Sequence, residues 1–307
     1  MKVFVTGGTG ALGRLTIPRL RTAGHDVRAV ARSEDKAVWL RDQGVEPVVV
    51  DLFDAPAVMD AVRGTDAVAH LATHVPPLLK AGRPKSWALH NRLRAEATPI
   101  LMDAARATGA TTFVKESVCF FYEDGGDAVL DEDAPLIESR FSAPSLSGER
   151  AAAVFDGDGR RAVVMRFGFF YGPWTRGTDE ALRLARFGLS PLAGRPDGYQ
   201  PMVHVDDAAA AVVAAIDGDA SGAFNVADDP TTKRANLEAF ASAFALRRPP
   251  RTIPSWILRL SAGSGADVLS GSRRVSSTRF RDATGWEPEY PSVIEGWPAV
   301  ARAREAA

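Results

Sequence analysis

Residues 1–13, MKVFVTGGTGALG, decide how this chain folds. An apolar run at 3–5 leads into a glycine-rich turn, and an amphipathic segment follows at 15–20. A strand, a glycine turn and a helix in this order predict a dinucleotide-binding site, because glycines let the backbone approach a pyrophosphate and the helix directs unpaired N–H groups at it. A plain structural turn is the weaker alternative. The expected contacts are Thr6, Gly7, Gly10, Ala11, Leu12 and Gly13.

The charge balance argues against two classes of partner. Of the 307 residues, 46% are hydrophobic and 24% charged, and the formal net charge is -1. This leaves no basic field for nucleic acid or an anionic membrane, and no apolar run has the length of a transmembrane helix. Cys119 is the only cysteine, so no internal disulfide and no cysteine metal cluster can form. We expect a cytoplasmic protein that binds neither nucleic acid nor membrane and holds no metal.

Apolar runs and helical stretches alternate through the first half of the chain, which is the pattern of a parallel sheet covered on both faces. After the opening strand, the expected strands are residues 25–32, 45–51, 66–71, 111–117 and 161–167. A helix is expected over 87–108, because this stretch has helical periodicity and ends at Gly109. The pattern predicts an α/β fold with a Rossmann-type, doubly wound parallel sheet.

The alternation weakens after Pro173. Helices are expected at 178–187, 206–216 and 236–246, and extended pieces at 202–205 and 224–226. We predict a dinucleotide-binding domain over residues 1–172 and a small C-terminal substrate lobe over most of 173–307, with segments near 200–228 returning to the first domain. The substrate cleft is expected between the two.

The end of the second strand bears on the choice between NAD and NADP. An acidic residue there accepts hydrogen bonds from the ribose of NAD, whereas an arginine accommodates the 2′-phosphate of NADP. The strand ends in Arg32, with Lys36 one helical turn later and no carboxylate at its end. The sequence therefore predicts NADP(H) in preference to NAD(H). The alternative is that Arg32 is solvated or pairs with Glu34 or Asp35.

Further motifs follow in a fixed order. Asp51 and Leu52 close the third strand and are expected at the adenine edge of the dinucleotide, with a cap for the next helix as the alternative for Asp51. After them come HLAT at 70–73, RFGFFYGP at 166–173, HVDD at 204–207, GAFNVAD at 222–228 and GWEP at 285–288. Together with TGGTGALG at 6–13, these motifs resemble the extended short-chain dehydrogenase/reductase family, the NAD(P)-dependent epimerases/dehydratases.

The resemblance covers nearly the whole chain. It implies a sheet of about seven strands, a small C-terminal substrate lobe, and a homodimer formed through the helices after strands four and five. It adds Leu71, Ala72 and Thr73 to the expected cofactor contacts. It also implies hydride transfer to or from a nicotinamide, with the Tyr of a Y-x-x-x-K motif as the acid–base group whose pKa the Lys lowers.

The chain departs from the family in its catalytic residues, because no Y-x-x-x-K occurs in it. The family's Lys is usually followed by a Glu one helical turn later. With Glu149 taken as that residue, Phe141 stands at the Tyr position and Ser145 at the Lys position. The serine-rich stretch after the fifth strand is replaced by KESVCFFY at 115–122, in which Ser117 keeps a hydroxyl. The ordinary dyad is therefore absent.

Four side chains are candidates for the proton chemistry: Ser117, Tyr122, Glu116 and His74. Tyr122 would lie past the end of the fifth strand, near the cleft mouth, although a structural aromatic is the favoured alternative. Glu116, near the end of a buried strand, is either an acid with a raised pKa or the partner of Lys115 or an arginine. His74 follows the fourth strand and faces the expected substrate entrance, with a solvated loop histidine as the alternative.

Aromatic residues indicate the substrate class. Family members that act on nucleotide sugars tend to carry an Arg before the V-D-D motif, where this chain has Gln200, and Arg273 is a second candidate for a phosphate contact. Aromatic clusters at 120–122 and 169–171 favour an apolar or polycyclic small molecule over a sugar nucleotide. The expected substrate contacts are Phe141, Ser145, Phe169, Tyr171, Trp174, Gln200 and Arg273.

We predict an NADP(H)-dependent oxidoreductase or epimerase acting on a carbonyl or hydroxyl of a small metabolite, with Glu116, Ser117 or Tyr122 providing the proton chemistry. Because the dyad is missing, the alternative is a non-redox cyclase, lyase or isomerase in which the cofactor is structural or absent. A non-catalytic NADP-sensing module is the third hypothesis, since a fold alone does not fix a function.

Overall fold

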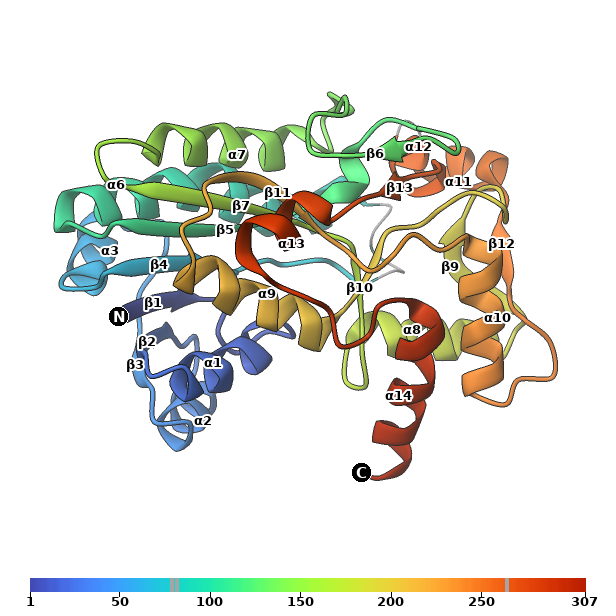
Figure 1. Ribbon diagram of the computed structural model, residues 1–307, viewed down its shortest axis with the longest axis horizontal. Helices are drawn as coiled ribbons and strands as arrows, with labels where there is room; N and C mark the ends of the chain where they lie inside the picture. Colours follow the sequence, from blue (N-terminus) through green and yellow to red (C-terminus); the bar gives the residue numbers. More distant parts are fainter. Residues whose placement is uncertain (78–79, 81–82, 263–264) are drawn as a thin grey trace.

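The computed structural model describes residues 1–77, 80, 83–262 and 265–307. Within these residues the centre is a parallel seven-stranded sheet in the order β11-β7-β5-β4-β1-β2-β3 (Figure 1). Its strands are β1 (Lys2–Thr6), β2 (Asp26–Val30), β3 (Glu46–Val48), β4 (Ala67–His70), β5 (Thr112–Val118), β7 (Arg161–Phe167) and β11 (Gly222–Val226). Each strand expected from the alternation in the first half of the chain is present.

Helices cover both faces of this sheet. One face carries α1 (Gly13–Thr22), α2 (Glu34–Asp42) and α9 (Val205–Asp217), and the other carries α3 (Ala55–Val62), α6 (Thr98–Thr108) and α7 (Ala143–Phe155). Successive side chains of a strand point to opposite faces, so β1 sends Val3 and Val5 into the first core and Phe4 into the second. The predicted doubly wound Rossmann-type fold is confirmed.

The helix expected over 87–108 is interrupted. The run consists of a 3-10 turn (Pro84–Trp87), α5 (Ala88–Arg92), a π-helical turn (Leu93–Ala97) and α6. It ends as expected at Gly109, whose φ of +87° forms a left-handed cap. A π-helical turn adds one residue without ending the helical run, so hydrophobic periodicity does not reveal it.

Shorter elements follow in the second half of the chain. They are α8 (Arg176–Ala185), β9 (Leu189–Ala193), α10 (Lys233–Ala243), β12 (Arg251–Ile253), α11 (Ser255–Ala262), α12 (Gly265–Ser270) and α14 (Val293–Glu305). Three two-stranded parallel sheets accompany them: β9 with β12, β8 (Phe169–Tyr171) with β10 (Met202–His204), and β6 (Val129–Leu130) with β13 (Arg274–Val275). Between α12 and α14 the chain passes back over the main sheet, where α13 (Thr278–Thr284) packs on β11 through Phe280 and Phe224.

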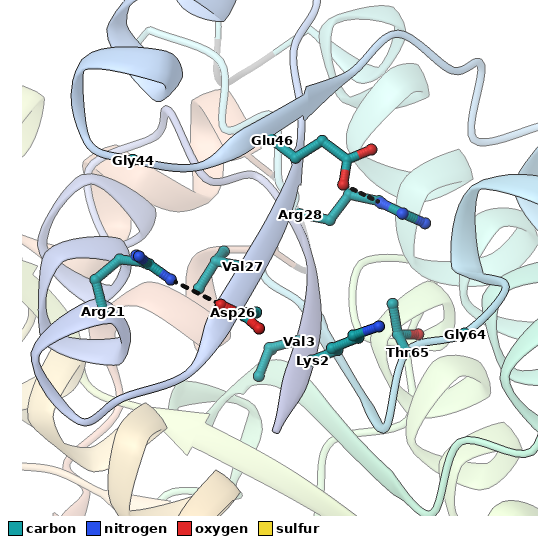
Figure 2. A pocket seen from close by; sticks show the side chains of 10 residues that line it. All are labelled: Lys2, Val3, Arg21, Asp26, Val27, Arg28, Gly44, Glu46, Gly64 and Thr65. Atoms are coloured by element: carbon teal, nitrogen blue, oxygen red, sulfur yellow. Dashed lines mark hydrogen bonds and ion pairs between the residues drawn. The ribbon is translucent and has the colours of Figure 1, made fainter.

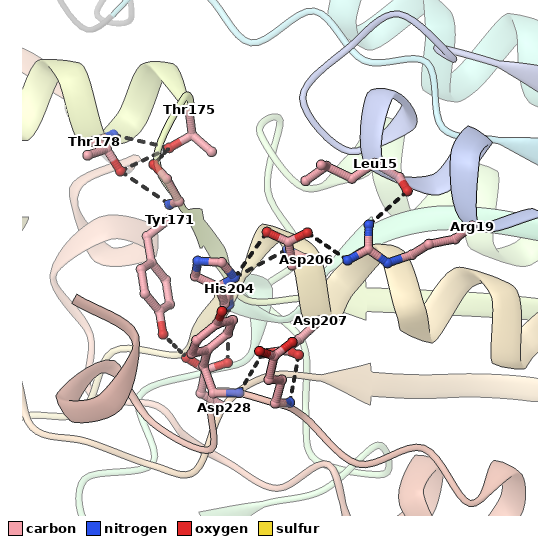
Figure 3. Close-up of polar contacts among 12 residues, drawn as sticks. Leu15, Arg19, Tyr171, Thr175, Thr178, His204, Asp206, Asp207 and Asp228 are labelled. Atoms are coloured by element: carbon pink, nitrogen blue, oxygen red, sulfur yellow. Dashed lines mark hydrogen bonds and ion pairs between the residues drawn. The ribbon is translucent and has the colours of Figure 1, made fainter. Parts of the chain in front are cut away.

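The HVDD segment links α1 and residues 289–290 to the start of α9 (Figure 3). Arg19 of α1 donates to Asp206 of α9 across 2.7 Å. The carboxylate of Asp207 accepts the backbone N–H groups of Glu289 and Tyr290, at 2.7 and 3.1 Å. His204 is buried, and its Nδ1 accepts the N–H of Asp206. These contacts give the motif a structural role.

A hollow of about 300 Å³ opens at the amino ends of β1, β2 and β3 (Figure 2). Both of its arginines are paired, Arg21 with Asp26 at 3.2 Å and Arg28 with Glu46 at 3.1 Å. Ligands of doubly wound sheets bind at the carboxyl ends of the strands, so the expected site lies at the opposite edge. None of the helices in the described part of the chain is both long and apolar enough to cross a membrane.

Candidate active site

The glycine turn forms a cradle that leaves no room for side chains. Gly7 has a φ of +75°, and a Cβ on it would lie 2.6 Å from the carbonyl carbon of Leu71. A Cβ on Gly13 would lie 2.3 Å from the carbonyl oxygen of Gly7. The turn therefore lies directly against the end of β4, and α1 begins at Gly13 with no side-chain cap. This arrangement fits the pyrophosphate of a dinucleotide.

Three cationic side chains gather at the end of β2. Arg32 is exposed and has no ion pair with any residue that the structure describes. Glu34, one of the partners considered for it, pairs with Arg41 at 2.8 Å instead. Burial lowers the pKa of Lys36, and the neighbouring charges of Arg32 and Arg14 lower it further. Arg14 was not predicted from the sequence, although its place directly after Gly13 is a usable signal.

The adenine-edge candidates follow β3. Asp51 is exposed, and its carboxylate accepts the N–H of Phe53 at 3.0 Å. Leu52 is buried. Helix α3 is capped by Asp54, which accepts the N–H of Ala57. The capping role considered as the alternative for Asp51 is therefore filled by Asp54.

A buried histidine links the glycine turn to the π-helical turn. His70 Nε2 donates to the carbonyl of Leu93 at 3.0 Å, so Nδ1 accepts from the hydroxyl of Thr6 at 2.7 Å. Burial, and then the charge of Lys115, lower the pKa of His70 to about 3. The imidazole is therefore neutral, in a single tautomer fixed by its two partners.

The π-helical turn also contributes one partner of a buried ion pair. Arg94 of the π-helical turn donates from Nη2 to both carboxylate oxygens of Glu116 on β5, at 2.7 and 2.6 Å. Its Nη1 donates to the hydroxyl of Ser145 on α7 at 2.8 Å. Arg94 is 2% exposed and Glu116 7%. Of the two roles expected for Glu116, the structure shows the ion pair.

A second buried network contains two more of the proton candidates. Ser117 donates to Glu149 of α7, and Arg166 of β7 holds the same carboxylate at 2.7 Å. Arg166 also donates to the hydroxyl of Tyr122 at 2.8 Å, which donates in turn to Asn225. Tyr122 is fully buried, and burial raises its pKa. It does not face a cleft mouth, and the structural alternative describes it.

The remaining candidates are dispersed. His74 and Trp174 are exposed, and Phe141 is half-buried beside Arg140. Leu71 is buried at the end of β4, ahead of the half-buried Ala72 and Thr73. Phe169 stacks on Phe120 with ring centroids 4.3 Å apart. Gln200 is buried.

Besides Ser145, two more of the expected substrate contacts have structural partners. Tyr171 is buried and donates to Asp228 at 2.8 Å. Arg273 is 1% exposed, and its guanidinium donates to the carbonyls of Tyr122, Val268 and Asp267. A guanidinium whose donors are taken by buried carbonyls is not available to a substrate phosphate, so this placement corrects the expectation for Arg273.

The fold and this site define an α/β enzyme that binds a nicotinamide dinucleotide at the carboxyl ends of its strands. The sequence model of the NAD dependent epimerase/dehydratase family matches residues 3–227. The chain belongs to this family and is an NAD(P)-dependent oxidoreductase or epimerase.

Relatives span the chain nearly from end to end. A Streptomyces protein named 3-diazoavenalumate denitrifying reductase is 34% identical over 306 residues, which cover 96% of this chain and 99% of the relative. The ceramide reductase of Caulobacter vibrioides is 29% identical over 310 residues, 97% of this chain and 89% of its own. The crystal structure of human epimerase family protein SDR39U1 with NADPH matches the fold with a TM-score of 0.81 at 24% identity, covering 98% of this chain and 99% of the human chain.

Proposed function

We propose that this protein is an NADPH-dependent reductase that replaces the diazo group of an aromatic substrate by hydrogen. One observation carries the proposal: Glu116, Ser117 and Tyr122 are all buried and hydrogen-bonded, so none of them is placed to give up a proton. Reducing a carbonyl calls for an acid beside the oxygen that becomes negative. A reaction that expels neutral dinitrogen has no such oxygen.

The reaction balances without a proton from the protein. When bound, NADPH supplies a hydride that forms the new C–H bond of an arenediazonium substrate, while the C–N bond breaks and its electron pair leaves with dinitrogen. The name of the Streptomyces relative supports this chemistry, because that protein is called a denitrifying reductase of a diazo compound. The carbonyl or hydroxyl substrate expected from the sequence is the competing candidate.

The side chains around the site suit a flat and electrophilic substrate. Phe120 and Phe169 stack, and the chain has the apolar ring of Phe141 at the sequence position where the family carries a hydroxyl. Nucleophiles would attack a diazonium group in competition with hydride. Cys119, the only thiol, is buried, and burial raises its pKa to about 12, so it supplies no thiolate.

The cations at the end of β2 support a preference for NADP over NAD. Arg14, Arg32 and Lys36 lie close enough for their charges to affect one another. Like charges gathered without a counter-ion repel each other, and a bound 2′-phosphate would relieve that repulsion.

The proposal is tested by mixing the protein with NADPH and an arenediazonium salt, and measuring NADPH oxidation and dinitrogen release. The matched control is Gly13→Val, in which the new side chain fills the cradle. We expect one dinitrogen per NADPH oxidised with the unaltered protein and neither signal above background with the variant. Oxidation of NADPH by aromatic ketones, with the diazonium salt left unreduced, would contradict the proposal.

A further inference from the structure

Small residues on α7 make room for two long cationic side chains. A Cβ on Gly148 would lie 2.5 Å from Cε of Lys115 and 2.7 Å from the carbonyl oxygen of Arg94. One turn earlier, Ser145 accepts from the Arg94 guanidinium. The positive charge on this face of α7 therefore comes from the π-helical turn and from β5.

The two cations are held in different ways. Lys115 is 1% exposed and donates from Nζ to the carbonyl of Glu116 at 2.8 Å. Arg94 has two carboxylate contacts and one hydroxyl contact, which fix the plane of its guanidinium. Buried charges cost free energy of desolvation and often add nothing to stability over apolar side chains, so stability alone does not account for this pair.

Arg94 is also linked to the cofactor cradle. It directly follows Leu93, whose carbonyl accepts from His70, and His70 accepts from Thr6 at the start of the glycine turn. Among the described residues, Nε of Arg94 and Nδ1 of His90, one helical turn earlier, have no hydrogen-bond partner although both atoms are buried. Single extra residues in helices occur frequently at functional sites.

We propose that Arg94 is the positioning residue of the reaction site. Through Glu116 and Ser145 it fixes the end of β5 against α7, beside the nicotinamide end of the dinucleotide site. This inference rests on the proposed function and deepens it: the pair aligns substrate and cofactor by geometry, and takes no part in proton transfer.

The test is the double variant Arg94→Met with Glu116→Met, because removing Arg94 alone strands a buried carboxylate, whereas replacing both partners preserves packing. The control is Arg92→Met with Glu96→Met, an exposed ion pair in the same helical run with a distance of 2.9 Å. The experiment measures the Kd for NADPH, the fluorescence emission of bound NADPH, and kcat and KM with the diazonium substrate.

We expect the double variant to fold and to bind NADPH within about threefold of the unaltered affinity, while kcat falls about 10- to 100-fold and the emission of bound NADPH shifts. Arg94→Lys, with one charge but no planar fork, should recover part of kcat. The control pair should match the unaltered protein. A folded double variant with unchanged emission and with kcat within twofold would overturn the positioning role. If the unaltered protein reduces no diazonium salt, the proposed function fails, yet Kd and emission still decide whether Arg94 positions the nicotinamide.

Discussion

Arg94 of the π-helical turn donates a hydrogen bond of 2.8 Å to Ser145 of α7, a residue 51 positions away in the chain. A serine and an arginine from separate elements thus meet at the place where the family resemblance implies a lysine of α7. The glycine cradle for the cofactor has the geometry expected from the sequence. The catalytic Tyr and Lys that the family has beside it are absent.

Replacing Arg32 by Ala is expected to lower the affinity for NADPH about ten- to a hundredfold, because a charge-assisted contact to the 2′-phosphate is lost. The affinity for NADH should not change. Titration of the fluorescence of both reduced nucleotides measures this ratio, with Arg41→Ala as the control at an exposed, paired arginine. An unchanged ratio of the two affinities would show that Arg32 does not read the phosphate.

Gly13→Ala should abolish NADPH binding, because its Cβ would lie 2.3 Å from the carbonyl oxygen of Gly7. Gly10→Ala is the graded control, since its Cβ would meet the same oxygen at 3.2 Å, a distance that a small shift relieves. Circular dichroism should show that both variants fold. Equal affinities for the two variants would exclude the cradle geometry.

Stability should fall as the pH drops below about 6.5, the ordinary pKa of histidine in the unfolded chain. Burial lowers the pKa of both His70 and His90 to about 3 in the folded protein. Between these values the unfolded chain binds protons that the folded chain does not, so each histidine removes about 1.4 kcal/mol of unfolding free energy per pH unit. By pH 5 the two together remove about 4 kcal/mol. Urea unfolding at pH 7, 6 and 5 measures this slope, and a flat profile would refute the buried neutral state.

Arg273→Met should destabilise the fold by about 2–4 kcal/mol, because buried carbonyls lose their donors. In the fraction of the variant that folds, KM for the substrate should equal that of the unaltered protein. Arg274→Met, at the neighbouring and less buried position, is expected to change stability by less than about 0.5 kcal/mol. A large rise in KM without loss of stability would restore Arg273 as a substrate contact.

The sequence predicted the cradle well because its requirement is local. Gly7 and Gly13 are fixed by backbone contacts within a few residues and with the end of β4, and their spacing is visible in the chain. The buried charges differ, since Glu116 meets Arg94 only through tertiary packing. Periodicity placed Arg94 on a helix but could not show the π-helical turn that carries it. The absence of the Tyr and Lys was readable, as were Phe141 and Ser145 at their positions, whereas the arginine that contacts Ser145 was not.

If no proton moves during hydride transfer, the rate should be the same in H₂O and D₂O. Single-turnover reaction of the NADPH complex with an arenediazonium salt measures this, with the ratio of the two rates expected near one. A ratio of about two or more would indicate a proton transfer in the transition state and would favour the carbonyl substrate.

The most direct measurement uses NADPH that carries deuterium at the transferable position of nicotinamide C4, followed by mass spectrometry and NMR of the product. The account predicts one deuterium at the ring carbon that had carried the diazo group, with dinitrogen released in equal amount. Oxidation of the cofactor with only protium at that carbon, or deuterium found at the carbinol carbon of a reduced ketone while the diazonium salt is untouched, would contradict it.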